Sequence, residues 1–239
     1  SFVGYPYHGL YGAHITKSMN NTIVHTLYSA TSNIHLVIHK GIYFLVDGDE
    51  SKIENHLEAL DIKPEQISFL VITHGHPDHS GAAAYFKEKH GIKIIAGKGD
   101  QQIINSGKLN KLCSTSALGD LVYSAVPKEF KAFNADVFIN EETSLAEYGI
   151  DGTTYPIPSH TEGSIAIVVD GLAFVGDIIR GKAMAKRTPA LHFYQCDMTR
   201  NEEVINEALT WDCETWYTGH FGPLKPARIE KWLESEPFK

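Results

Sequence analysis

Four side chains that commonly bind transition metals occur within six consecutive residues of this 239-residue chain. They are His74, His76, Asp78 and His79, and they follow a largely apolar run from Ile67 to Thr73. Three imidazoles and one carboxylate form a ligand set that zinc or iron(II) prefers, whereas calcium and magnesium prefer oxygen ligands. The pattern therefore indicates a metal site rather than an incidental polar turn.

Sequence periodicity on both sides of this motif predicts the elements that must position it. The apolar run from Ile67 to Thr73 is predicted to be a strand buried on both faces, and Ser80 to His90 has helical character. Gly91 ends that helix, and Ile92 to Ala96 reads as the next strand. The four polar side chains are therefore expected on a loop between a strand and a helix.

The rest of the chain predicts further strands and helices around this unit. Three strands of an antiparallel meander and a helix are expected before it, at Ile23 to Tyr28, Ile34 to His39, Ile42 to Val46 and Ser51 to Leu60. Strands are expected after it at Val137 to Asn140, Thr153 to Ile157, Ile165 to Asp170, Leu172 to Val175 and Trp216 to Thr218, with helices at Asn201 to Trp211 and Pro226 to Leu233.

These elements fit one domain spanning residues 1–239, with sheets inside and helices outside. Residues 98–135 are the least regular part, with a helix expected from about Asp100 and an irregular stretch after it. Two interpretations of this segment stay open. It is either a lid over a site or a long surface excursion.

Composition excludes several classes of function. The chain is 43% hydrophobic and has no apolar run near the roughly 18–20 residues that span a bilayer, so no membrane partner is expected. Its 29 acidic residues exceed its 21 basic ones, and no basic stripe is present to neutralise nucleic-acid phosphates. We therefore expect a small-molecule substrate. The 13 histidines agree with metal binding, because imidazole is a common metal ligand.

The cysteines predict neither a disulfide framework nor a thiolate zinc site. There are three, Cys113, Cys196 and Cys213, and no two form a C-x-x-C pair. The compartment stays open: the sequence begins at Ser1 without a methionine, so a processed periplasmic or secreted form and a cytoplasmic form are both considered.

Four motifs together resemble the metallo-β-lactamase superfamily. His74, His76, Asp78 and His79 match its H-x-H-x-D-H signature. Three later segments resemble its second histidine motif, its bridging-aspartate motif and its last histidine motif, namely residues 158–164, 174–177 and 218–220. The resemblance implies an α/β fold of the αββα type, in which two sheets pack face to face and a dinuclear metal site lies along one edge.

The resemblance also implies which residues bind metal. His74, His76 and His160 would hold a first zinc ion, Asp78, His79 and His220 a second, and Asp177 would bridge the two. Two zinc ions per chain are expected, with iron or manganese as alternatives. A hydroxide held between two such ions would be available at neutral pH to attack a carbonyl group, and Asp78 and Asp177 would take part in catalysis.

Other side chains are candidates for supporting roles. Thr73, Ser80, Ser159 and Thr161 are candidates to orient the imidazoles through their second nitrogen. Tyr194 and His192 are candidate acids or oxyanion partners, with ordinary packing as the alternative. The basic residues from Arg180 to Arg187 would either bind an anionic group of the substrate or form a solvated loop.

The function expected from these features is hydrolysis of an ester, thioester or lactam-type carbonyl by a dinuclear zinc enzyme. A β-lactamase similar to the third subclass of metallo-β-lactamases is one alternative. A mononuclear iron persulfide dioxygenase is an alternative of another class. The fold alone does not select among them, because one fold carries many reactions.

Overall fold

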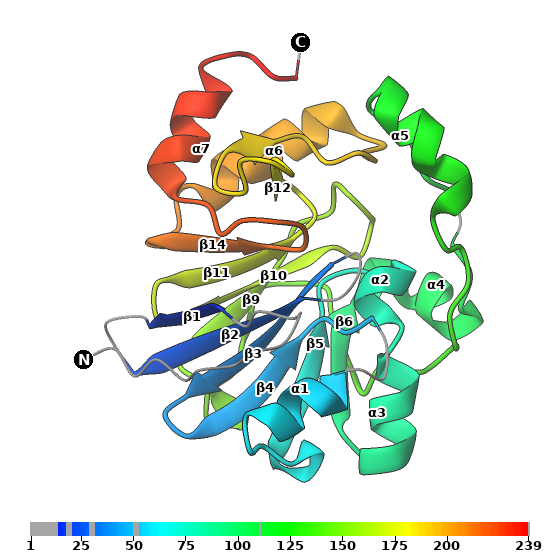
Figure 1. Cartoon of the computed structure of the whole chain (residues 1–239), viewed down its shortest axis with the longest axis vertical. Helices are drawn as coiled ribbons and strands as arrows, with labels where there is room; N and C mark the ends of the chain where they lie inside the picture. Colours follow the sequence, from blue (N-terminus) through cyan, green and yellow to red (C-terminus); the bar gives the residue numbers. More distant parts are fainter. Residues whose placement is uncertain (1–13, 18–20, 29–31, 50–52, 110, 239) are drawn as a thin grey trace.

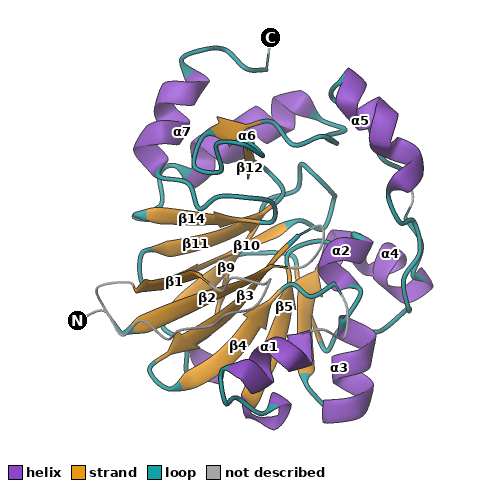
Figure 2. Ribbon diagram, viewed as in Figure 1, coloured by secondary structure: helices purple, strands orange, loops and turns teal. Residues whose placement is uncertain are grey.

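Two β-sheets pack face to face in the protein, and helices cover both outer faces (Figure 1; Figure 2). The computed structural model describes residues 14–17, 21–28, 32–49, 53–109 and 111–238. The αββα arrangement that the resemblance implies is confirmed by three clusters of buried side chains, one between the sheets and one under each helical layer.

The larger sheet has seven strands, and their order in space follows their order in the sequence. The strands are β1 (His14–Lys17), β2 (Thr22–Tyr28), β3 (Asn33–His39), β4 (Ile42–Val46), β5 (Ile67–Ile72), β6 (Lys93–Gly97) and β7 (Val137–Ile139). Strands β2, β3 and β4 are antiparallel neighbours, which confirms the predicted meander, and β1 adds a fourth antiparallel strand that the sequence did not predict. Strands β4 to β7 run parallel.

The smaller sheet has five strands in the order β14-β11-β10-β9-β8. They are β8 (Thr143–Ser144), β9 (Gly152–Pro156), β10 (Ile165–Val169), β11 (Leu172–Gly176) and β14 (Thr215–Thr218). Strands β11 and β14 are parallel, so their carboxyl ends meet at the same edge. A separate pair is formed by β12 (Arg180–Gly181) and β13 (Pro189–Ala190).

Alternation along the strands explains the layers. In β5, Leu70 and Ile72 join the cluster under the outer helices, whereas Phe69 and Val71 join the cluster between the sheets. Successive side chains of a strand point to opposite faces, so a strand buried on both sides must be apolar throughout. The apolar run of β5, which only the exposed Ser68 interrupts, therefore reflects its position inside the larger sheet, between β4 and β6.

Helices close the sandwich on both outer faces (Figure 1). Helices α1 and α3 cover the larger sheet through residues such as Leu57 and Phe86, and helices α6 and α7 cover the smaller sheet through residues such as Val204 and Ile229. The helices are α1 (Ile53–Ala59), α2 (Pro77–Ser80), α3 (Ala83–His90), α4 (Gln101–Ser106), α5 (Ala117–Val122), α6 (Met198–Ala208) and α7 (Pro226–Leu233).

The predicted helix from Ser80 to His90 is observed as α3, and a separate short helix, α2, precedes it and carries Asp78 and His79, which were expected on a loop. Helix α2 begins at Pro77, whose fixed φ angle suits the first helical position, and α3 follows after a short break. Gly81 lies at the break, where an added Cβ atom would come within 2.1 Å of the Asp49 carbonyl oxygen. Close approach of two backbone segments therefore requires glycine here, which periodicity could not reveal.

The segment of residues 98–135 connects β6 to its parallel neighbour β7, and it contains α4 and α5. The expectation of no disulfide is wrong, because Cys113 in this segment is bonded to Cys196. The two cysteines are 83 positions apart, so local spacing carried no signal of the bond. The disulfide ties the excursion to the chain that follows β13. Whether the segment acts as a lid stays a prediction.

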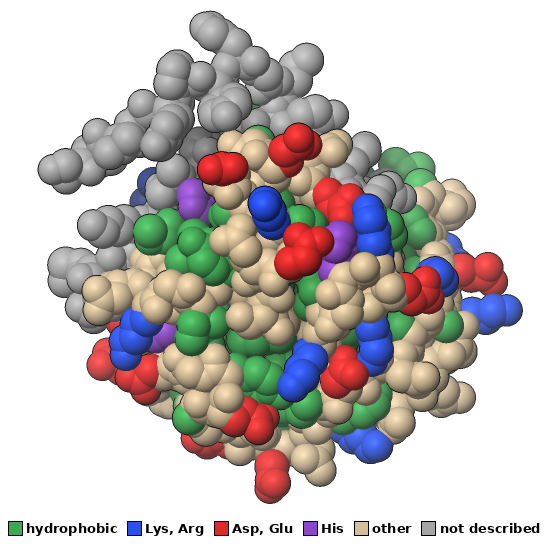
Figure 3. Space-filling model, turned by 90° about the horizontal axis from the view of Figure 1, so that it is seen from below, with side chains coloured by type: hydrophobic (Ala, Val, Ile, Leu, Met, Phe, Trp, Pro, Cys, Tyr) green, Lys and Arg blue, Asp and Glu red, His purple; other side chains and the backbone are tan. Residues whose placement is uncertain are grey.

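The surface does not concentrate charge of one sign on the face viewed in Figure 3. Acidic and basic side chains alternate there among apolar and polar ones. Within the described part of the chain, the helices are also too short or too polar to cross a lipid bilayer.

Candidate metal centre

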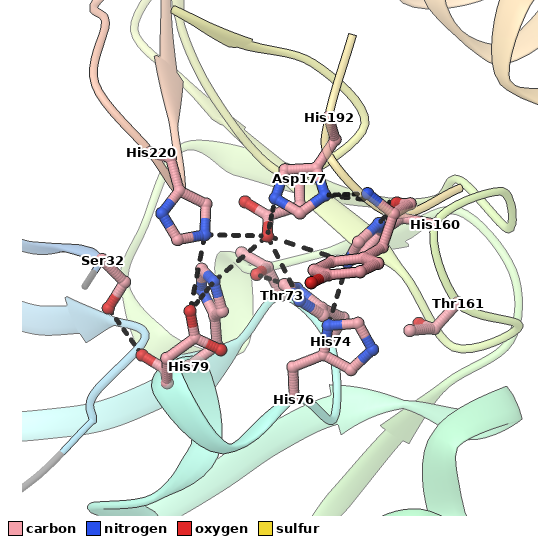
Figure 4. A network of polar contacts seen from close by, with 12 residues as sticks. Ser32, Thr73, His74, His76, His79, His160, Thr161, Asp177, His192 and His220 are labelled. Atoms are coloured by element: carbon pink, nitrogen blue, oxygen red, sulfur yellow. Dashed lines mark hydrogen bonds and ion pairs between the residues drawn. The ribbon is translucent and has the colours of Figure 1, made fainter. Parts of the chain in front are cut away.

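The predicted ligands come from loops that follow the ends of strands. The loop after β5 and helix α2 carry His74, His76, Asp78 and His79, while the loop between β9 and β10 carries His160. Asp177 directly follows β11, and His220 follows β14 after one glycine. The structure thus brings all the predicted ligands together at one edge of the sandwich (Figure 4).

His74, His76 and His160 form the first donor group, in which one nitrogen of each lies within 4.8 Å of the others. The Nδ1 atom of His76 and the Nε2 atom of His160 are 3.0 Å apart, and all three side chains are buried. Burial lowers the pKa of His74 and His160 well below 6.5 and that of His76 to about 4. These imidazoles are therefore neutral at pH 7 and keep a lone pair for a metal ion.

Asp78, His79 and His220 form the second donor group. The Oδ2 atom of Asp78 lies 3.5 Å from Nε2 of His79 and 3.4 Å from Nε2 of His220. Burial alone would lower the pKa of His79, but Asp177, Asp78 and Asp47 together raise it well above 6.5. The surrounding carboxylates therefore favour a positive charge at this position, whether a proton or a metal ion supplies it.

Asp177 lies between the two groups and contacts both. Its Oδ2 atom is 3.7 Å from the Nε2 atoms of His74 and His160, 3.3 Å from that of His79 and 3.2 Å from that of His220. Burial opposes ionisation of Asp177, yet the imidazoles of His220, His192 and His79 hold its pKa well below 3.8. One ionised carboxylate thus faces the donors of both groups, as a bridging ligand requires.

Several buried donor atoms of the cluster have no hydrogen-bond partner in the protein. They are Nε2 of His74, Nε2 of His79 and Oδ1 of Asp177. A buried polar atom without a partner costs about 1–3 kcal/mol, so such atoms rarely persist without a function. Their convergence fits a site built to hold metal ions, and the donor set of imidazoles and carboxylates suits zinc or iron.

Asp47 orients two of the predicted ligands and was not identified from the sequence. Its Oδ2 atom is 2.9 Å from Nδ1 of His79 and accepts a hydrogen bond from the hydroxyl of Thr73, which also lies 3.1 Å from Nδ1 of His74. Such carboxylate–imidazole contacts fix the ring orientation of a metal ligand. An acidic residue directly after the buried strand β4 was the available signal.

Of the four residues expected to orient imidazoles, Thr73 alone contacts a ring nitrogen among the described hydrogen bonds. The hydroxyl of Ser80 donates to the His76 carbonyl, Ser159 accepts from Asn201, and Thr161 donates to Asp100. These three residues therefore stabilise the backbone of the loops rather than the rings.

Asp100 joins the two loops that carry the first donor group. Its carboxylate accepts hydrogen bonds from the backbone N–H groups of Gly75 and Gly163 and from the hydroxyl of Thr161. The side chain is buried, and it links the loop after β5 to the loop after β9. Asp100 was predicted only as a helix start, because these partners are distant in the sequence.

Tyr194 has a different role from the one that the sequence suggested. Its hydroxyl donates to the Gly119 carbonyl in α5, so the phenol is engaged outside the metal centre. Its backbone carbonyl instead lies 2.8 Å from Nδ1 of His160. The assignment of Tyr194 as a catalytic acid or oxyanion partner is therefore corrected to a positioning role through the main chain.

The sequence model of the metallo-beta-lactamase superfamily matches residues 30–220, which include every predicted ligand and most of both sheets. The chain belongs to this superfamily. Among curated proteins it is 28% identical to the hydroxyacylglutathione hydrolase GloC of Haemophilus influenzae over 137 residues. That match covers 55% of this chain and 58% of GloC, so the chain spans little more than half of this relative's length.

Solved structures of the superfamily share the fold at low sequence identity. The metallo-β-lactamase MIM-1 of Novosphingobium pentaromativorans has a TM-score of 0.65 at 17% identity, with 95% of this chain and 87% of that chain covered. A di-iron-bound form of TTHA1623 has a TM-score of 0.61 at 17% identity, covering 86% of this chain and 96% of that one. At such identities the likeness establishes the fold alone.

Two glycines let the metallo-β-lactamase fold bring its motifs into contact. A Cβ atom on Gly219 would lie 2.1 Å from Oδ1 of Asp177 and 2.6 Å from Cε1 of His79. Gly176 has a φ angle of +55°, and a Cβ atom there would lie 2.7 Å from the Thr73 hydroxyl oxygen. The last histidine motif and the bridging-aspartate motif therefore both depend on glycine for close approach.

The basic segment of this superfamily member is divided between two environments. Arg180 is half-buried, and its guanidinium lies 3.8 Å from the ring centroid of Phe193. Burial lowers the pKa of Arg180, and the negative charge of Asp177 opposes that shift. Lys182, Lys186 and Arg187 are exposed on the turn between β12 and β13. Arg180 is thus the one basic residue of this described segment that is half-buried, packing its side chain against the protein.

Proposed function

We propose that the protein is a hydrolase with a dinuclear metal centre, most simply two zinc ions per chain. The observation that carries this proposal is the position of Asp177, whose Oδ2 atom lies 3.2–3.7 Å from imidazole nitrogens of both donor groups. His74, His76 and His160 would hold one ion and Asp78, His79 and His220 the other. A shared carboxylate offsets the repulsion between two cations held close together.

When bound, divalent ions of this type lower the pKa of a water ligand from about 15.7 towards about 7 and polarise a carbonyl oxygen. The residues of this chain would position the ions and leave a path for the substrate. Asp78 and His220 have side chains that are 23% and 15% exposed, whereas His74 and His79 are fully buried. The substrate therefore reaches the centre from the side of Asp78 and His220, where the Asp78 carboxylate can orient the attacking water.

A thioester or ester is the substrate class that we favour. The 28% identity to GloC, a hydroxyacylglutathione hydrolase, supports a thioester more directly than the structural likeness to MIM-1 supports a lactam. The substrate is proposed to be a small, anionic molecule, and the candidate cation for it is the half-buried guanidinium of Arg180, which lies on the ring of Phe193, the residue after His192. Lactam hydrolysis stays the first alternative.

Metal analysis of the purified protein tests the dinuclear centre. About two zinc ions per chain, with loss of hydrolysis after chelation and recovery on adding zinc, is the expected result. A single iron per chain together with oxygen consumption in the presence of a persulfide would overturn the proposal and support the dioxygenase. The di-iron form known for TTHA1623 makes it necessary to measure both metals.

A substrate panel tests the reaction. Acyl-glutathione thioesters, homoserine lactones, nitrocefin and bis-nitrophenyl phosphate each represent one class of scissile bond. We expect the highest kcat/KM with a thioester or an ester. Higher turnover of nitrocefin would assign the protein to the β-lactamases, and turnover of the phosphodiester alone would contradict the choice of a carbonyl substrate.

We further propose that the protein works in an oxidising compartment. The Cys113–Cys196 disulfide supports this, because such bonds persist in the periplasm or outside the cell and are rare in the cytosol. Rapid thiol blocking in fractionated cells of the source organism, followed by mass spectrometry, should find the pair oxidised. A cytosolic, fully reduced pair would contradict the proposal.

A further inference from the structure

His192 lies inside the candidate metal centre, although no motif of the sequence assigns it there. It follows β13, and its side chain is 5% exposed. Its Nε2 atom lies 3.1 Å from Oδ2 of Asp177, closer than the nitrogen of any of the predicted histidine ligands. Figure 4 shows the ring on the opposite side of Asp177 from His79.

The Nε2 atom of His192 is buried and has no hydrogen-bond partner. Its contact with Asp177 is short but lacks the geometry of a hydrogen bond. Nε2 of His74 and Nε2 of His79 share this condition, and both are donors that the superfamily motif assigns to metal ions. An unpartnered imidazole nitrogen that points into a cluster of such nitrogens indicates the same use.

The ring of His192 also packs against His160 as the other members of the first donor group do. The centroid distance from His160 is 4.6 Å for His192, 4.6 Å for His74 and 4.6 Å for His76. All three rings stand edge-on to His160, at interplanar angles of 82°, 89° and 74°. His192 is therefore placed around His160 as a metal-binding neighbour would be.

One carbonyl group orients both rings. The Tyr194 oxygen lies 2.8 Å from Nδ1 of His160 and 3.2 Å from Nδ1 of His192. If each Nδ1 donates a proton to this oxygen, each Nε2 keeps its lone pair for a metal ion. The opposite tautomer of His192 would accept from the Tyr194 N–H at 3.2 Å and would carry its proton on Nε2, 3.1 Å from Oδ2 of Asp177, so only the first tautomer can bind a metal ion.

The backbone that carries His192 is anchored independently of any metal ion. The His192 carbonyl accepts a hydrogen bond from the Thr115 hydroxyl, and the backbone N–H of Gln195 donates to the Cys113 carbonyl. The Cys113–Cys196 disulfide closes the same junction. The ring is therefore held in place beside Asp177 before a metal ion binds.

We propose that His192 is an additional ligand of the metal centre, which binds through Nε2 together with His160 and Asp177. This inference rests on the proposed dinuclear centre and adds an eighth residue to its seven predicted ligands. It assigns to His192 a direct bond to metal rather than the acid or oxyanion role that the sequence suggested. The imidazole of His192 would add one nitrogen donor to those of the first group, next to His160 and Asp177.

The test compares cobalt(II) binding to the wild-type protein with binding to His192→Phe and His192→Ala. Phenylalanine keeps the ring volume against His160 but removes the nitrogen. Both variants are expected to weaken the binding of one metal equivalent by more than about tenfold in chelator competition, since even outer partners of ligands contribute about 10- to 100-fold. The visible absorption of bound cobalt should change in both. His39→Phe, at a buried imidazole paired with Thr22, serves as the control and should change neither.

The outcomes separate this inference from the proposed function. Wild-type protein that binds no metal would overturn the dinuclear centre itself. Wild-type protein that binds two equivalents, with an unchanged affinity and cobalt spectrum in His192→Phe, would overturn the role of His192 alone. Loss of affinity in His192→Ala but not in His192→Phe would also overturn it, because packing alone would then explain the effect. Circular dichroism confirms that each variant is folded.

Discussion

Asp177 shows how much a single residue does in this site. Its carboxylate contacts histidines from four separate segments of the chain, and those imidazoles keep it ionised despite its burial. A neutral side chain at this position would leave the imidazoles without a common anion. The charge of the bridge therefore matters as much as its ability to bind metal.

Replacement of this bridge is the most direct test at the residue scale. Asp177→Ala should reduce the metal content from about two ions per chain to about one and should abolish hydrolysis, because the second ion loses the shared charge that offsets cation repulsion. Elemental analysis and kcat measure the two effects. Asp151→Asn, at an exposed ion pair with Lys40, is the control. Unchanged metal content and rate in Asp177→Ala would show that the bridging assignment is wrong.

Gly219 gives a steric test of the same centre. Its Cβ position lies 2.1 Å from Oδ1 of Asp177, so Gly219→Ala should displace the carboxylate and lower both the metal affinity and kcat by about 10- to 100-fold, the effect typical of losing an outer partner of a ligand. Gly91→Ala is the control. Its added Cβ atom would meet nothing within 4 Å, so any loss of stability would come from backbone strain at the φ angle of +66°, and metal affinity should not change. Unchanged metal affinity in Gly219→Ala would contradict the crowding that the distance implies.

The buried side chain of His35 should make the free energy of unfolding depend on pH. Burial lowers its pKa from 6.5 to about 3, with smaller effects from the Thr218 backbone and from His79. Below pH 6.5, His35 binds a proton in the unfolded chain but stays neutral in the folded protein. The free energy of unfolding therefore falls as the pH drops from about 6.5 to about 3, by at most about 1.4 kcal/mol per pH unit.

Urea unfolding of the metal-free protein between pH 7.5 and pH 4.5 measures this slope. His35→Gln removes the titrating group, so the variant should lose less stability on acidification than the wild type, even if it is less stable at pH 7. His35 is buried between the rings of Phe174 and Tyr217, so the difference in slope reports on a protonation in the core. Identical slopes would contradict the assignment.

The site residues that could be predicted from the sequence differ from those that could not in how far apart they lie along the chain. His74, His76, Asp78 and His79 are neighbours on one loop, so their pattern is visible in the sequence itself. Asp47, Asp100 and His192 meet the cluster only after strands far apart in the chain pair with one another. Spacing cannot report such contacts, because they depend on the register of whole sheets.

At the scale of elements, the junction between α5 and the chain after β13 supports one side of the site. The disulfide, the Thr115 contacts with His192 and Phe193, and the Tyr194 hydrogen bond to Gly119 all lie there. The strands β6, β7, β11 and β14 of the two main sheets were predicted from periodicity, whereas the short strands β12 and β13 were not. This junction was not predicted either, because it joins irregular segments whose residues have no repeating pattern.

A disulfide-free variant tests the junction. Cys113→Ser combined with Cys196→Ser should lower the free energy of unfolding by about 2–4 kcal/mol, since the bond closes a long loop in the unfolded chain. It should also weaken metal binding, because the Tyr194 carbonyl that orients His160 belongs to the residue two positions before Cys196. Chemical denaturation and chelator competition measure the two effects.

Cys213→Ala is the matched control for the disulfide variant. Cys213 is buried without a disulfide partner, and burial raises the pKa of its thiol to about 11, so it is an unreactive core residue. This control should leave metal affinity unchanged. Unchanged stability and metal affinity in the double variant would show that hydrogen bonds alone hold the junction.

At the scale of the whole molecule, the two β-sheets contribute ligands to the same candidate metal centre. The larger sheet supplies the first motif and the smaller sheet supplies His160, Asp177 and His220, so metal ions would cross-link the two sheets. The chain carries a formal net charge of −8, and two divalent cations would reduce that negative charge where carboxylates and imidazoles are most crowded.

Metal removal should therefore destabilise the whole protein rather than the site alone. A ligand that binds only the folded state adds about 4 kcal/mol when its free concentration is about 1,000 times its Kd. Without metal, Nε2 of His74, Nε2 of His79 and Oδ1 of Asp177 remain buried and unpartnered. We expect chelation to lower Tm by several degrees or more, and zinc to restore it. The Asp177→Ala variant should show a smaller shift, because it binds less metal. A Tm that is the same with and without metal would mean that the apolar contacts between the sheets hold them together without help from the centre.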